Sequence, residues 1–144
     1  MRIPSAVPLF ACLAVACETP SGGGLPNAGL GLRVQTAASY YQAGDTVSFS
    51  VLNVSFDTLW VSRCCNRITV PFDRWDGLAW RQVSGDPCLA VCPQGPLALA
   101  PRVSCTSLVY SAFATGQYRL HVGAARRGDA GTDWSATSNA FQVR

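Results

Sequence analysis

Short stretches in which apolar and polar residues alternate recur along most of this chain, and they constrain the fold more than any other feature. In one of them Val47, Phe49 and Val51 are separated by Ser48 and Ser50. A period of two places the apolar side chains on one face of an extended strand. No stretch sustains the i, i+3, i+4, i+7 spacing of an amphipathic helix. The sequence therefore predicts an all-β chain.

Turn-forming residues divide these stretches into about seven to eight short strands, spaced by about 8–12 residues as in sandwiches and barrels. Asp76-Gly77 is a strong hairpin signal, and Pro71 suggests an edge strand. We expect an antiparallel β-sandwich, with a small barrel as the alternative. The expected strands are 30–35, 47–52, 59–62, 68–72, 78–83, 103–110, 117–122 and 140–143.

The first 16 residues have the layout of a secretory signal peptide. One Arg precedes an uncharged stretch from Ile3 to Ala16, which is shorter than the ~20 residues of a membrane-spanning helix. The run 13–17, Leu-Ala-Val-Ala-Cys, resembles the lipobox of bacterial lipoproteins, and this resemblance implies a lipid on Cys17. The run 9–12, Leu-Phe-Ala-Cys, is a competing lipobox that would place the lipid on Cys12. An ordinary cleaved signal peptide is the third possibility.

The residues after Cys17 are polar and rich in glycine, which is typical of a flexible tether. In bacterial lipoproteins, a Glu such as Glu18 after the lipidated cysteine is associated with the outer membrane. The expected organisation is therefore a signal peptide over 1–16, a lipidated cysteine and tether over 17–28, and one β-sandwich over 29–144.

Three segments resemble bacterial immunoglobulin-like domains. They are Tyr41–Asn53, with its Gly-Asp turn before an alternating strand, then Leu97–Pro101, and Gly116–Leu120 with its Gly-x-Tyr strand. The succession of strand and turn motifs over roughly 40–143 is also similar to that of the Bacillus intracellular proteinase inhibitor family. The resemblance implies an immunoglobulin-like antiparallel β-sandwich of seven to eight strands, with a buried Trp60 and a tyrosine corner at Tyr118.

Cysteine is the most chemically informative residue type, with seven in the chain. An exported protein meets an oxidising environment, so we expect disulfides. With Cys12 removed and Cys17 lipidated, five cysteines remain, which allow at most two bridges. We expect one bridge from Cys64 or Cys65 to Cys88, and leave the second open. The five disulfide candidates are Cys64, Cys65, Cys88, Cys92 and Cys105.

Metal binding and catalysis find less support than disulfides. Cys64, Cys65, Cys88, Cys92 and His121 could supply soft metal ligands, but paired Cys-x2-Cys motifs are missing. No nucleophile elbow, phosphate-binding loop or metalloprotease motif occurs. We therefore expect no catalytic residues, no cofactor and no bound metal.

Two regions carry candidate binding residues. Trp75 and Trp80 flank the predicted hairpin, where they either pack on each other or form an exposed patch. The expected loop Gly123–Asn139 carries Arg126, Arg127 and Trp134, although a Trp folded back onto the sandwich is also possible for position 134.

The net charge of +3, without a basic cluster, argues against nucleic acid as a partner. We expect an exported lipoprotein attached to the membrane, in the outer membrane, that acts as a non-catalytic binding or accessory module for a protein or glycan partner. One alternative is a proteinase inhibitor acting through an exposed Ser84–Pro101 loop. Another is a metal- or redox-handling protein that uses the cysteines.

Overall fold

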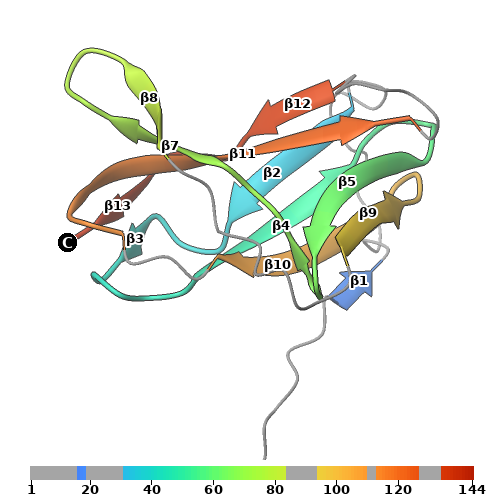
Figure 1. The fold of residues 1–144 in the computed structure, drawn as a ribbon, viewed down its shortest axis with the longest axis horizontal. Coiled ribbons are helices and arrows are strands. Elements are labelled where there is room, and N and C mark those ends of the chain that lie inside the picture. Colours follow the sequence, from blue (N-terminus) through green and yellow to red (C-terminus); the bar gives the residue numbers. More distant parts are fainter. Residues whose placement is uncertain (1–15, 19–30, 84–93, 110–112, 127–133) are drawn as a thin grey trace, which may run out of the picture.

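The structure is a computed structural model that describes residues 16–18, 31–83, 94–109, 113–126 and 134–144 (Figure 1). Within these ranges the chain is all-β, with thirteen strands and no helix. None of the described residues belongs to a helix long and apolar enough to cross a membrane. The strands are β1 (Ala16–Glu18), β2 (Leu32–Thr36), β3 (Tyr40–Tyr41), β4 (Val47–Asn53), β5 (Leu59–Cys64), β6 (Arg67–Ile68), β7 (Phe72–Trp75), β8 (Trp80–Val83), β9 (Gln94–Leu99), β10 (Ser104–Val109), β11 (Gly116–Ala125), β12 (Trp134–Thr137) and β13 (Phe141–Val143).

The strands form two sheets. The four-stranded sheet has the order β1-β10-β4-β2 and is antiparallel throughout. The nine-stranded sheet is built along β3-β13-β11-β5-β6, with β12 and β7 also paired to β11, β8 paired to β7, and β9 paired to β5. The β3–β13 pair is parallel, and the other pairs of this sheet are antiparallel. The longest strand, β11, thus connects the hairpin β7–β8 to β5.

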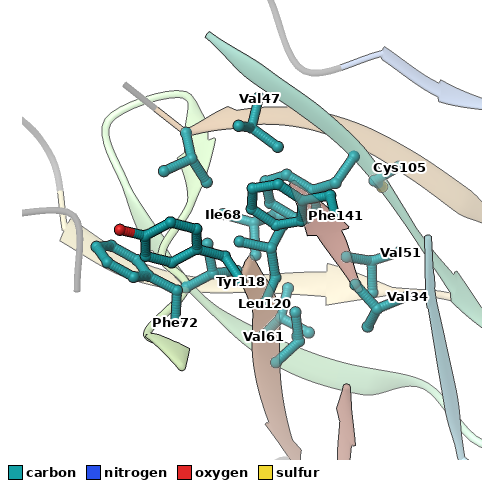
Figure 2. Close-up of a cluster of buried hydrophobic side chains, with 14 of the residues drawn as sticks. Val34, Val47, Val51, Val61, Ile68, Phe72, Cys105, Tyr118, Leu120 and Phe141 are labelled. Atoms are coloured by element: carbon teal, nitrogen blue, oxygen red, sulfur yellow. The ribbon is translucent and has the colours of Figure 1, made fainter. Parts of the chain in front are cut away.

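One hydrophobic core receives side chains from both sheets (Figure 2). In β4 every second residue is buried, from Val47 to Asn53, as the alternation predicts. From β11 the core receives Tyr118, Leu120 and Val122, all less than 4% exposed. Full burial of a large apolar side chain contributes about 1.5–3 kcal/mol, so this alternation is the main reason these segments fold as strands.

Tyr118 joins the aromatic part of this core to the chain that precedes its strand. Its ring lies 4.9 Å from the ring of Phe113 and 6.0 Å from that of Phe141, centroid to centroid. Its hydroxyl donates a hydrogen bond to the carbonyl oxygen of Ala114, at 2.9 Å. The buried ring and its satisfied hydroxyl together fix the turn that leads into β11.

The turn between β4 and β5 is organised by a buried amide. Asn53 is fully buried, and its Nδ2 donates to the carbonyl oxygens of Asp57 and Leu99, at 2.7 and 2.8 Å. Its Oδ1 accepts from the backbone N–H and the hydroxyl of Ser55, at 2.9 and 2.6 Å. These four bonds hold a turn on which the side chain of Phe56 is 73% exposed.

Several sequence expectations about strands are wrong. The predicted strand 68–72 is divided between β6 and β7, with Pro71 in the gap. The connection Ser84–Pro101 contains β9, in which Leu99 is fully buried. Pro96 is tolerated there because β9 pairs only with β5 among the described residues, so an edge remains where no N–H is needed.

The predicted loop Gly123–Asn139 is also largely wrong in its boundaries. Strand β11 continues to Ala125, and β12 pairs with it through Ala124 and Trp134.

Trp60 is half-buried on β5, while its neighbours Leu59 and Val61 are fully buried in the core. The resemblance to immunoglobulin-like domains implied a buried Trp60. This expectation is wrong, because side chains alternate between the two faces of β5 and Trp60 lies on the face away from the core.

Candidate binding surface

The β7–β8 hairpin has a rigid turn at its tip, where the sequence predicts it. Gly77 adopts φ +99°, a conformation that favours glycine. Asp76 Oδ1 accepts the backbone N–H groups of Leu78 and Ala79, at 2.8 and 2.7 Å. Its Oδ2 forms an ion pair with Arg81 Nε at 2.8 Å. One carboxylate therefore fixes both the turn and the start of β8.

These contacts also determine the ionisation of Asp76. The hydrogen bond from Arg81 comes first, followed by those from the N–H groups of Ala79 and Leu78, and together they hold the pKa of Asp76 well below its usual range. Each of these donors stabilises the charged carboxylate. The carboxylate of Asp76 is therefore ionised at neutral pH and can accept all three of these hydrogen bonds.

Both predicted tryptophans lie on this hairpin and contact each other. Trp75 and Trp80 are opposite residues of the two strands, with ring centroids 5.5 Å apart and planes tilted by 59°. Trp75 remains 37% exposed, and Leu78 at the tip is 90% exposed. The hairpin extends away from the body of the molecule (Figure 1). The pair thus combines cross-strand packing with an exposed apolar surface.

Arg119 of β11 attaches this hairpin surface to the sheet, a role that the sequence does not predict. Its Nε lies 2.8 Å from Asp73 Oδ2, and its guanidinium carbon lies 4.6 Å from the centroid of Trp80. Asp73 is only 7% exposed. Arg119 and Asp73 are directly opposite residues of β11 and β7, which is why residues 46 positions apart can pair.

A row of aromatic and amide side chains crosses five strands on the outer face of this sheet. The register pairs Tyr40 with Gln142, Gln142 with Gln117, and Trp75 with Trp80. Continuing the β11–β7 register by one residue places Gln117 next to Trp75. Directly opposite residues share one face of a sheet. We name Tyr40, Gln142, Gln117, Trp75 and Trp80 the aromatic–amide row.

The neighbours of this row hold its ends in place. At one end the guanidinium carbon of Arg144 lies 4.8 Å from the ring centroid of Tyr40, and Arg144 Nη2 donates to Gln142 Oε1 at 3.3 Å. At the other end Arg119 covers Trp80. With strands about 4.8 Å apart, the row spans about 19 Å.

The second predicted region lies at the opposite end of β11 and is separate from the row. Arg126 Nη2 forms an ion pair with Asp57 Oδ2 at 3.0 Å, and its guanidinium carbon lies 5.0 Å from the centroid of Trp134. Trp134 packs against the core, and a Cβ on Gly31 would come within 2.5 Å of its Cδ1. Trp134 is therefore folded back onto the sheet, while Arg127 lies outside the described residues.

Cys17 is bonded to Cys105, a pairing that the sequence does not predict. The two residues are opposite each other in β1 and β10, 88 positions apart in the chain. A sulfur atom in a disulfide cannot also carry a thioether-linked lipid, so the predicted lipidation of Cys17 is incompatible with this bond. Of the expected tether over 17–28, Cys17 and Glu18 belong to β1, and positions 19–28 lie outside the described residues.

Cys64 and Cys65 are each disulfide-bonded, in agreement with their prediction as disulfide candidates. Their sulfur atoms are 4.0 Å apart, so they are not bonded to each other. Their partners, like Cys88 and Cys92, lie outside the described residues. Cys65 adopts φ +55° in the turn between β5 and β6.

These disulfides also remove the thiolates on which a metal site or a reactive cysteine would depend. Among the described residues, no three His, Cys, Asp or Glu side chains come together as metal ligands.

The proposed inhibitory loop Ser84–Pro101 is a β-strand over 94–99, and its first part lies outside the described residues. No protein-family model matches this sequence, and no curated protein matches it either.

Proposed function

We propose that this chain is an exported, membrane-anchored lipoprotein whose single domain binds a partner without catalysis, through the hairpin β7–β8 and the adjoining aromatic–amide row. The observation that supports binding most directly is the half-exposed Trp75 beside Trp80, on a turn fixed by Asp76 and braced by Arg119. Exposed Trp, Tyr and Arg on a rigid support are typical of binding hot spots, because little conformational entropy is lost on binding.

Disulfide bonding supports export. Cys17 is bonded to Cys105, and Cys64 and Cys65 are each bonded to another cysteine. Four disulfide-bonded cysteines among the described residues of so small a domain are typical of oxidising compartments such as the bacterial periplasm or cell surface.

The cysteines that are already disulfide-bonded also limit which cysteine can carry the lipid. Among the described residues Cys17, Cys64, Cys65 and Cys105 are disulfide-bonded, and the other three cysteines of the chain lie outside them. We propose that Cys88 and Cys92 pair with Cys64 and Cys65, and that Cys12, in the run Leu9-Phe10-Ala11-Cys12, carries the lipid. Placement in the outer membrane remains a prediction tied to Glu18, and thus to a lipid on Cys17.

The topology supports an immunoglobulin-like sandwich as the finer description of the fold. The orders β2-β4-β10 and β13-β11-β5 correspond to A-B-E and G-F-C of that fold. The hydrogen bond from Tyr118 to the carbonyl four residues upstream is that of a tyrosine corner. The half-buried Trp60 is a departure from the family pattern.

Intact-mass analysis of the mature protein, before and after reduction, tests export and anchoring. We expect a lipid-modified N-terminal peptide beginning at Cys12, and a mass increase of six hydrogens on reduction. Peptide mapping should recover Cys17 linked to Cys105. A lipid on Cys17, or free thiols at Cys64 and Cys65, would contradict the proposal.

Photo-crosslinking tests the binding surface. A benzophenone side chain that replaces Leu78 should yield a discrete adduct in cells that export the protein. The matched control replaces Phe56, which is 73% exposed against 90% for Leu78 and lies at the other end of β11. Equal labelling at both positions, or none at Leu78, would argue against the hairpin as a binding surface.

A further inference from the structure

We infer that the aromatic–amide row binds a linear, uncharged glycan chain laid across the strands. This inference rests on the proposed binding role of the same surface and specifies its ligand. It begins from the composition of the row, which is an aromatic ring, two neighbouring amides and two aromatic rings in register across five strands.

Each side-chain type in the row complements a feature of a sugar ring. The faces of Tyr40 and Trp75, which are 63% and 37% exposed, can stack on the apolar C–H face of a pyranose. A glutamine amide has a donor and an acceptor side by side, as do the hydroxyl groups on adjacent sugar carbons. Gln117 and Gln142 lie between the aromatic residues, where they can bind hydroxyls at the edge of a stacked sugar.

The amides are available for such contacts. The side chain of Gln117 makes no hydrogen bond to another described residue, and neither does that of Gln82, which lies opposite Asp73 beside the row. Gln142 uses only Oε1, toward Arg144. A half-buried amide without a protein partner is better satisfied by a ligand that donates and accepts than by an apolar one.

The charge of the surface favours a ligand without negative charge at its hairpin end. All five members of the row are uncharged, and the neighbouring Asp73 and Arg119 neutralise each other at 2.8 Å. Arg144, beside Tyr40, adds one positive charge at the opposite end of the row. The carboxylate of Asp73 is buried beneath Arg119, so an acidic ligand that attracted Arg119 would leave that carboxylate without its partner. An uncharged glycan would leave the ion pair between Asp73 and Arg119 intact.

The shape of the surface favours a chain rather than a single sugar. The row extends over about 19 Å along the direction in which strands repeat every 4.8 Å. Its ends are fixed, because Arg144 lies over Tyr40 and Arg119 lies over Trp80. Aromatic rings held in place at both ends of the row can bind successive sugar units without rearrangement.

Titration followed by 1H–15N NMR tests this inference on the disulfide-bonded protein. The probes are linear oligosaccharides of glucose, mannose, galactose, xylose and N-acetylglucosamine at millimolar concentration, with polygalacturonate as the acidic comparator. We expect at least one neutral oligosaccharide to shift the side-chain amide signals of Gln117 and Gln142 and the indole signal of Trp75. Trp75→Ala and Gln117→Ala should each weaken that binding at least tenfold.

Two control variants test whether these effects are specific to the row. Phe56→Ala removes an exposed aromatic at the other end of β11, and Gln35→Ala removes an exposed amide from the other sheet. Both should bind within twofold of the unmodified protein. Binding of polygalacturonate alone, or no binding of any neutral probe, would overturn the glycan inference. A hairpin-specific crosslink in that case would leave the proposed binding role intact.

Discussion

Replacing Asn53 with alanine should destabilise this domain strongly. The amide makes four hydrogen bonds, to Asp57, Leu99 and twice to Ser55, and is fully buried. Alanine removes all four and leaves the carbonyl oxygen of Leu99 without this donor in the interior. The substitution therefore disrupts the β4–β5 turn and its attachment to β9 together.

The expected magnitude follows from these bonds. At about 1 kcal/mol net for each hydrogen bond, the loss in the free energy of unfolding is about 4 kcal/mol. That is a large fraction of the ~5–15 kcal/mol that stabilises a typical domain. For a domain of this size it corresponds to a decrease in Tm of about 15 °C. Circular dichroism melting of the disulfide-bonded protein would measure it.

Asn139→Ala is the matched control. Asn139 is exposed and makes two side-chain bonds to Thr36, which lies 103 positions away in the chain. We expect a loss of about 1–2 kcal/mol, because solvent can replace the lost partners. If Asn53→Ala costs no more than Asn139→Ala, the argument from burial and bond number is refuted.

Three further predictions follow from the described contacts. Gly31→Ala should lower stability by about 2–3 kcal/mol in chemical denaturation, because φ is +96° and the new Cβ would lie 2.5 Å from Trp134 Cδ1; an unchanged midpoint would contradict this packing. Because the pKa of Asp76 is lower in the folded than in the unfolded chain, its contribution is fully present above an ordinary carboxyl pKa of about 3.9 and is lost as the pH falls through the lower folded-state value. Hairpin tryptophan fluorescence should therefore stay constant from pH 7 to about pH 4, and an Asp76-dependent transition near neutrality would refute this assignment. Cys105→Ala should cost about 4–5 kcal/mol in thermal unfolding, from the 88-residue separation of its bridge to Cys17; a loss near 1 kcal/mol would indicate that the bridge is not formed.

The sequence predicts the core better than the edges of the sheets. The alternations in β4 and β11 are long and regular, and burial drives both, so Phe49 and Leu120 lie in the core as expected. The sequence does not predict strand β9, because Gly95 and Pro96 are typical of turns. Only the edge position beside β5 makes them compatible with a strand. The sequence does not predict strand β1 either, because it begins within an apolar segment that also fits a signal peptide.

The residues of the candidate site also differ in how well the sequence predicts them. Some are brought together by neighbouring residues in the chain, and others only by strand pairing between distant segments. Asp76-Gly77 predicts a hairpin, and a hairpin necessarily brings Trp75 opposite Trp80. Arg119 and Gln117 join them only through the register of β11 against β7, across more than forty positions of chain. Neither residue carries a local signal, because an exposed polar residue on a strand is also what an ordinary solvated face requires.

The bond between Cys17 and Cys105 changes how the domain would meet a membrane. With a lipid on Cys12, only four residues lead to Ala16, where β1 begins, and such a segment reaches at most about 14 Å. The glycine-rich stretch predicted as a tether then connects β1 to β2 within the domain instead of separating the domain from the lipid. On this proposal, the lipid would hold the edge of the four-stranded sheet near the bilayer. The aromatic–amide row lies on the outer face of the other sheet, so the proposed anchor on Cys12 predicts a partner that is accessible close to the membrane surface rather than at the end of a long tether.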